Sequence, residues 1–201
     1  KLDVAGGTKS TFYTSDGGRG FKQDSVAFVS TYSNGADANA ANDIGSTTNR
    51  WRDGFFSGGI YLGGTATVNL LNHYEQGTYS PILQNSSGTA ATMSHQNGYW
   101  TRIGNQVTVG GTLIWSANGS NANSYTVITM PFSNTGATNA RAAGTLGAVQ
   151  GIANGATLRL VIDPGQNQAY VIQQNSTSYS HTNNISASGA IYGFSITYRL
   201  T

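Results

Sequence analysis

Carboxylate side chains are considered first, because glycoside hydrolysis normally needs two of them, one acting as acid and the other as nucleophile or base. Residues 73–201 contain only Glu75 and Asp163. We interpret both as structural. Glu75 lies in the segment 73–81, which we interpret as a structural motif, and Asp163 opens an Asp-Pro-Gly turn where its side chain would bond local backbone amides. The remaining acids all precede residue 73: Asp3, Asp16, Asp24, Asp37, Asp43 and Asp53. A cleft between chains could gather some of these, so a hydrolytic site in that region is the alternative hypothesis.

The sequence offers little for other kinds of chemistry. The chain has no Cys, which excludes thiolate nucleophiles and thiolate metal sites. Its histidines, His73, His95 and His181, form no recognisable metal-ligand spacing, although an oligomer could gather one His per chain on its axis. No serine lies in a Gly-x-Ser-x-Gly elbow with acid and His partners. We therefore predict no catalytic residue, no metal ion and no cofactor.

Binding is better supported than catalysis, because the segments between the predicted strands are rich in Asn, Ser, Thr and Gly. Sugar recognition needs flat aromatic faces against C–H patches, together with amide, hydroxyl or guanidinium groups for the sugar hydroxyls. Exposed Tyr is also ordinary on a β-sheet surface, which is the alternative interpretation of several of these side chains. The candidate receptor-binding residues are Tyr125, Arg141, Tyr170, Tyr179, His181 and Asn183.

The composition limits the classes of partner. Glycine accounts for 27 of 201 residues and charged residues for only 9%, against roughly 7% and about 25% in ordinary soluble domains. That balance indicates many turns and neutral, hydroxyl- and amide-bearing surfaces. The net charge of +2 and the scattered basic residues make nucleic acid an unexpected partner. Apolar runs are too short for a membrane helix, so no membrane insertion is expected, and the start at Lys1 is typical of an excised fragment.

Strand patterns dominate after residue 73. Residues 106–116 alternate, with Val107, Val109, Leu113 and Trp115 on one face, and the preceding run 98–103 forms a predicted hairpin with them around Gly104-Asn105. Residues 157–163 and 169–173 predict a second hairpin around Asp163-Pro164-Gly165. The longest predicted strand is 190–200, whose alternation places six side chains on one buried side: Ala190, Tyr192, Phe194, Ile196, Tyr198 and Leu200.

Two regions follow from this pattern. Residues 1–72 contain only short, Gly-broken apolar clusters that cannot bury a core alone, which indicates that other copies of the chain complete it. We interpret them as an irregular, β-rich and trimerising shaft and neck. Residues 73–201, with several short strands and no useful helical period, predict an all-β head of the β-sandwich (jelly-roll-like) type.

Five motifs resemble the C-terminal neck and head region of bacteriophage tail fibres and receptor-binding proteins. In chain order they are residues 43–53 (DIGSTTNRWRD), 57–65 (SGGIYLGGT), 73–81 (HYEQGTYSP), 98–107 (GYWTRIGNQV) and 193–198 (GFSITY). Each motif alone is weak, but their shared order is specific. The departures are mild: His73 stands where the family often has Asp, and Tyr79 where it often has Trp.

The resemblance implies an intertwined homotrimer at the distal tip of a tail fibre on the virion, joined to an upstream fibre shaft and facing the extracellular space. It implies host attachment by an adhesin that binds a bacterial surface polysaccharide, either lipopolysaccharide or capsule, or an outer-membrane receptor. A tailspike-type polysaccharide depolymerase, with its carboxylates between chains in the neck, remains the alternative. The resemblance transfers no binding site, because the shared motifs are structural.

Overall fold

The computed structural model describes residues 11–12, 20–23, 28–31, 36, 44, 46–119, 125–152, 157–174, 179–182 and 185–200. The chain forms two compact units, Lys1–Phe56 and Ser57–Thr201. The described residues contain strands and one 3-10 turn at Thr67–Asn69, but no α-helix. None of them forms a helix that could cross a bilayer. The predicted all-β class is therefore confirmed.

The first unit contains a small antiparallel sheet of three strands, β1 (Thr11–Phe12), β2 (Gly20–Gln23) and β3 (Phe28–Thr31). At the start of the second unit, β4 (Ile60–Tyr61) pairs with β5 (Leu70–Leu71). Gly59, just before β4, has φ of 94° and lies against the backbone of Leu71 and Asn72, so only glycine fits there. Sheets of two or three such short strands cannot supply a core of their own.

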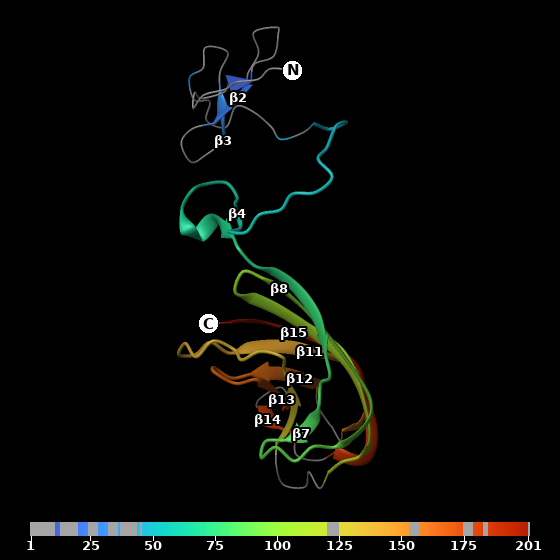
Figure 1. Ribbon diagram of the computed structural model, residues 1–201. Coiled ribbons are helices and arrows are strands. Elements are labelled where there is room, and N and C mark those ends of the chain that lie inside the picture. Colours follow the sequence, from blue (N-terminus) through green and yellow to red (C-terminus); the bar gives the residue numbers. More distant parts are fainter. Residues whose placement is uncertain are drawn as a thin grey trace. The chain divides into compact units, whose positions relative to one another are not determined.

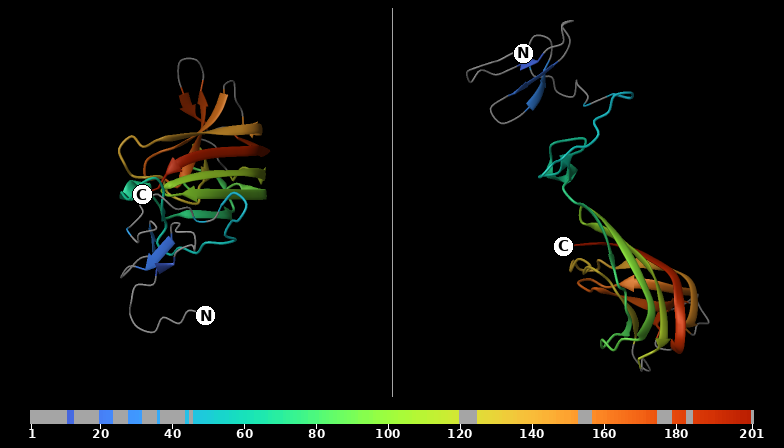
Figure 2. Two further views of the ribbon diagram at one scale, coloured as in Figure 1. Left: turned by 90° about the horizontal axis from the view of Figure 1, so that it is seen from above. Right: turned by 45° about the vertical axis from the view of Figure 1, so that its right-hand side comes forward.

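The rest of the second unit is one antiparallel ten-stranded sheet (Figures 1 and 2). Its path runs β6-β8-β9-β15-β11-β12-β13-β10-β7, and β14 pairs with the free part of β13. The strands are β6 (Tyr74–Tyr79), β7 (Leu83–Asn85), β8 (Thr92–Ile103), β9 (Gln106–Ala117), β10 (Thr126–Thr129), β11 (Ala142–Ile152), β12 (Thr157–Ile162), β13 (Gln168–Gln174), β14 (Tyr179–His181) and β15 (Ile185–Arg199).

Both predicted hairpins are confirmed. The β8–β9 hairpin turns at Gly104, whose φ of 59° suits a tight turn, and the β12–β13 hairpin turns around Gly165, with φ of 72°. β15 is the longest of the described strands, as predicted, and the structure places it between β9 and β11.

The sheet curls until its two edges approach each other. The edge strands β6 and β7 are consecutive along the chain and are joined by only three residues, which span at most roughly 10 Å. Within this connection, Pro81 accepts a hydrogen bond from Gln96 on β8, and Ile82 exchanges two with Thr129 on β10. The connection therefore ties strands near opposite ends of the sheet path, and Figure 2 shows the resulting curl.

The core lies inside the curl. On β9, Val107, Val109, Leu113 and Trp115 are all buried, which confirms the predicted alternation. The same side receives residues from β7, β10, β12, β13 and β15, including Leu83, Ile128, Leu160, Ile162, Val171 and Ile196. Tyr198 belongs to this core and Tyr79 packs against it, and burial raises the pKa of both side chains above the ordinary tyrosine value.

One predicted core residue is exposed. Tyr192 was expected on the buried side of the last strand, but half of its surface is accessible, and Ile191 is buried in its place. The register against β9 shifts by one residue between Ile191 and Phe194, and Gly193 adopts a φ of 94°. This β-bulge inverts the alternation on its N-terminal side, so Phe194, Ile196 and Tyr198 are buried as predicted while Tyr192 faces outward.

Candidate functional site

An aromatic cluster lies where β10, β13 and β14 meet. The rings of Tyr125 and His181 are stacked, with centroids 4.1 Å apart and an interplanar angle of 26°. Tyr170 meets both rings edge-on, with its centroid 4.8 Å from that of His181 and 6.2 Å from that of Tyr125. The three rings therefore form one continuous aromatic surface, with Tyr125 about half exposed.

Strand pairing explains how Tyr170 and His181 come close, and Tyr125 directly precedes β10. Tyr170 lies opposite Val127 on β10, and His181 lies opposite Ile172 on β13. By strand alternation these positions face away from the core, because Val171 between them points inward. Val127 and Ile172 are nevertheless buried, since the aromatic rings beside them cover this face.

A groove of about 320 Å³ adjoins this cluster on the outer face of β11, β12 and β13. This volume lies at the lower end of the range for small-ligand sites, roughly 300–1,000 Å³. Ala143, Val161 and Ile172 give it an apolar floor, and its polar groups come from Gln174, His181, Arg141 and Asp163. The groove thus combines aromatic edges, an apolar surface and a few hydrogen-bonding groups.

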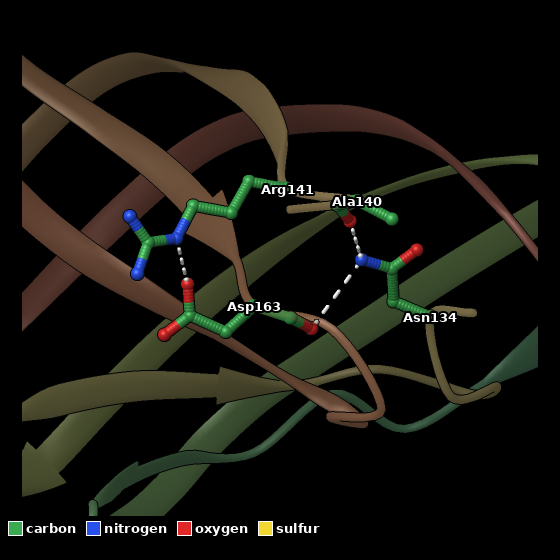
Figure 3. A network of polar contacts seen from close by, with 4 residues as sticks. All are labelled: Asn134, Ala140, Arg141 and Asp163. Carbon is green, nitrogen blue, oxygen red and sulfur yellow. Dashed lines mark hydrogen bonds and ion pairs between the residues drawn. The ribbon is translucent and has the colours of Figure 1, made fainter. Parts of the chain in front are cut away.

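Arg141 and Asp163 form an ion pair at one end of the groove (Figure 3). The Nε–H of Arg141 donates to Oδ1 of Asp163 at 2.7 Å. The pairing of Ala142 with Ile162 brings these two residues opposite each other, one position beyond the ends of β11 and β12. The expectation that the Asp163 carboxylate serves its own turn is therefore corrected: cross-strand register directs it to Arg141 instead.

Asn134 fixes the loop that carries Arg141. Its side chain is almost fully buried, and its amide donates to the carbonyls of Ala140 and Asp163, as Figure 3 shows. Its backbone also exchanges hydrogen bonds with the turn at Gly165 and Gln166. A buried amide with satisfied donors holds both loops in place, so Arg141 is positioned before any ligand arrives.

The other described carboxylates lie elsewhere and face cations. Glu75 on β6 is opposite Arg102 on β8, with Oε2 at 3.9 Å from Nη1, and its Oε1 is 3.6 Å from Nδ1 of His73. Asp53 contacts Arg52. Four strands separate β6 from β12 along the sheet path, so Glu75 and Asp163 do not share one face of neighbouring strands. Among the described residues, no group of three or more His, Asp or Glu side chains could hold a metal ion.

Four of the six candidate receptor-binding residues are brought together by the fold. Tyr125, Tyr170 and His181 form the cluster, and Arg141 lines the adjoining groove. Tyr179 lies on β14, but its side chain is outside the described residues, as is the whole of Asn183.

The sequence pattern assigned Asp163 to its own turn and did not indicate Asn134 or the apolar floor of the groove as part of a site. A usable signal existed for the floor: Val161 and Ile172 occupy outward positions of strands whose inward positions are already apolar. No signal in the sequence links Arg141 with Asp163, because 21 residues separate them and the pairing depends on the register of β11 against β12.

Chemically, the groove is suited to holding a neutral or charged polar ring. Aromatic edges accept C–H faces, while guanidinium, carboxylate and amide groups bind hydroxyls with defined geometry. Within the described part of the groove, Asp163 is the only carboxylate, and it is already paired with Arg141. The chain matches no protein-family model and no curated protein. The interpretation of the groove as a binding site therefore rests on its geometry.

Proposed function

We propose that this chain is the receptor-binding tip of a bacteriophage tail fibre, which attaches the virion to a glycan on the bacterial surface without cleaving it. The observation that carries the proposal is the aromatic cluster of Tyr125, Tyr170 and His181 beside the groove. The ordered motifs between residues 43 and 198 add the tail-fibre context. Lipopolysaccharide and capsule are the receptor classes that fit this chemistry.

Reversible binding agrees with the size and openness of the groove. One shallow site of millimolar affinity contributes about 4 kcal/mol, which is too little to hold a virion. Several identical sites on one fibre tip raise the avidity by orders of magnitude without any new contact. Weak sugar binding by each chain is therefore sufficient once the chain is oligomeric.

Assembly as a homotrimer is supported by exposed apolar side chains before the head. In the single chain, Phe55 is 94% exposed and Trp51 75% exposed, and the same stretch contains further exposed residues, Ile44, Phe56, Ile60, Tyr61 and Leu62. Exposed apolar groups in this number indicate an interaction surface. Three copies that wrap these segments around each other would bury them, and the motif resemblance favours three.

A jelly-roll-like pairing of two layers is the finer architecture that we infer for the head. It is supported by the short connection between the edge strands β6 and β7, which folds the long sheet back on itself.

Binding of the fluorescently labelled full chain to a panel of bacterial strains tests the function. We expect binding to the susceptible strains, competition by their purified lipopolysaccharide or capsule, and no release of oligosaccharide. Release of oligosaccharide, or a fall in capsule viscosity, would instead support the depolymerase alternative. A chain that bound no strain and no glycan would have a purely structural role, and the proposal would be rejected.

A further inference from the structure

A second cavity, of about 210 Å³, lies where the loop before β11 crosses the end of β15. The crossing is fixed by a hydrogen bond of 2.7 Å from the backbone N–H of Thr135 to the carbonyl of Arg199. Its lining includes Ala140, Ala142 and Tyr198 together with six residues that carry amide, hydroxyl or guanidinium groups: Gln106, Asn134, Thr135, Arg141, Thr197 and Arg199. No carboxylate occurs among the described residues that line this cavity.

Two arginines line this cavity. Arg199 ends β15 and lies opposite Gln106 on β9. Arg141 comes from the segment before β11, beyond Gly144 and Ile196, where the pairing of β11 with β15 ends. The Nε–H of Arg141 is bonded to Asp163, which lines the groove and not this cavity.

Two arginines beside one cavity, without a carboxylate among its described lining residues, are unfavourable for folding alone, because like charges repel. Residues that break a local rule of stability without a structural gain are expected at functional sites. Arginine presents a planar fork of donors that matches carboxylate and phosphate groups. An anion in the cavity would therefore neutralise the excess positive charge and add charge-assisted hydrogen bonds.

The cavity is bordered by a loop that Asn134 holds in place, and it adjoins the aromatic groove. Asn134 is 3% exposed, and its amide ties the loop to the carbonyls of Ala140 and Asp163. Arg141 and Ala142 line both the cavity and the groove. A ligand ring in the groove therefore lies beside residues that also line the cavity.

We propose that the cavity between Arg141 and Arg199 is an anion subsite, which takes a carboxylate or phosphate substituent of the glycan whose ring occupies the adjoining groove. This inference rests on the proposed function and narrows the receptor to an acidic glycan. Residues 73–201 contain four arginines, no lysine and two acids. Arg141 and Arg199 are therefore two of only four arginine or lysine side chains in the head that could attract an anionic ligand.

The test titrates the full chain with glucuronate, glucose 6-phosphate and neutral glucose, and follows the arginine Nε–H signals by NMR at about 0.15 M salt, where long-range electrostatics are screened. Glucuronate or glucose 6-phosphate is expected to shift the signals of Arg141 and Arg199, and glucose is not. A response to only one anionic sugar identifies carboxylate or phosphate as the preferred group. Equal responses to glucose and to both anionic sugars would overturn the subsite.

The variants Arg199→Gln and Arg159→Gln separate a local site from general charge. Arg159 lies on the outer face of the same sheet, opposite Thr145 and outside both cavities, so it is a matched control. Loss of a charge-assisted pair should weaken binding of the anionic sugar about tenfold or more in Arg199→Gln. Arg159→Gln should change it by less than about twofold, as expected of a distant surface charge. Equal losses in both variants would contradict the proposal.

Cell binding separates this proposal from the proposed function. If the unchanged chain and Arg199→Gln bind susceptible cells equally well, the anion subsite is overturned while the adhesin function stands. If the chain binds no cells but glucuronate or phosphate sugars still shift the Arg199 signal, the subsite stands and the adhesin function is overturned.

Discussion

The ring of Trp115 on β9 lies over the backbone of Gly189, its direct partner on β15. Four further aromatic residues face a glycine in the same way across neighbouring strands: Trp100 over Gly77, Tyr79 over Gly98, Tyr99 over Gly110 and Phe194 over Gly111. Much of the glycine content therefore serves strand interiors, where a missing side chain leaves room for a large ring. Aromatic cover of this kind helps to fix register in a curved sheet.

Gly189→Ala is expected to destabilise the head. A Cβ at this position would collide with the ring of Trp115 and the carbonyl of Gln150, neither of which can move without disturbing the core. Overpacking of this kind should lower the free energy of unfolding by roughly 2 kcal/mol or more. Urea unfolding measures the loss, and Gly136→Ala serves as the control because its added Cβ would meet nothing within 4 Å. Similar stabilities for the two variants would contradict the role assigned to the Trp115–Gly189 contact.

Alternation and turn residues predicted five strands at least in part, namely β8, β9, β12, β13 and β15, but not the closure of the sheet. The inward residues of β9 and both hairpin turns follow from a period of two and from Gly104 and Gly165. The exposure of Tyr192 could not be predicted, because a bulge adds one residue without leaving a mark in the apolar pattern. The curl depends on long-range contacts such as the hydrogen bond from Gln96 to the carbonyl of Pro81. The apolar period of a single segment does not indicate which other segment it will contact.

The sequence predicted four residues of the candidate site but not how the fold arranges them. Tyr125, Tyr170 and His181 were chosen individually as polar-segment aromatics, and the three-way pairing of β13 with β10 and β14 brings them together. The Arg141–Asp163 pair depends on the register of β11 against β12. A single sequence carries no information about register between strands so far apart in the chain.

Tyr79 and Tyr198 should respond differently to loss of their hydroxyl groups. The hydroxyl of Tyr198 donates to the carbonyl of Phe132 at 2.8 Å, whereas that of Tyr79 is buried without a partner among the described residues. Tyr198→Phe should therefore cost about 1 kcal/mol, and Tyr79→Phe should be neutral or stabilising by up to about 1 kcal/mol. Urea unfolding at pH 7 compares them, and a larger loss in Tyr79→Phe would reverse the assignment.

The same two tyrosines predict a loss of stability in alkali. Burial raises the pKa of both side chains in the folded state, with the neighbouring Tyr198 adding to the effect at Tyr79. The neutral form is favoured by folding, so this contribution is complete below the unfolded pKa of about 10 and is lost as the pH rises above it. The free energy of unfolding should begin to fall at about pH 10 and should keep falling as the pH rises toward the raised pKa of the folded state. The double variant Tyr79→Phe, Tyr198→Phe should show a smaller fall, and an unchanged pH dependence would sink this explanation.

Phe55→Ser should weaken the proposed trimer. Burying a Phe side chain contributes roughly 1.5–3 kcal/mol, and the side chain of Phe55 is almost fully exposed in one chain. Light scattering of the unchanged protein is expected to give three times the 21.0 kDa of a single chain. The variant should dissociate at concentrations at which Tyr192→Ser, a loss of similar size on the head, remains assembled. A mass near 21.0 kDa for the unchanged protein would remove the trimer altogether.

Tyr125→Ala should reduce glycan binding while leaving the fold intact. The Tyr125 ring stacks on His181 and is 49% exposed, so its loss removes aromatic surface beside the groove without opening the core. An aromatic contact worth about 0.5–1.5 kcal/mol corresponds to a loss of roughly threefold to tenfold per site. Multivalent binding to cells multiplies this loss over the sites engaged, so attachment should fall more steeply than the affinity of one site.

Tyr192→Ala is the matched control for this loss. Tyr192 is 50% exposed on β15 and faces outward, but it lines neither cavity and has no part in the aromatic cluster. It therefore removes an equally exposed tyrosine from the same sheet at a position where no sugar is expected. Surface-plasmon measurements with immobilised lipopolysaccharide should show unchanged binding for Tyr192→Ala and weakened binding for Tyr125→Ala. Equal binding by both variants would place the receptor site elsewhere on the head.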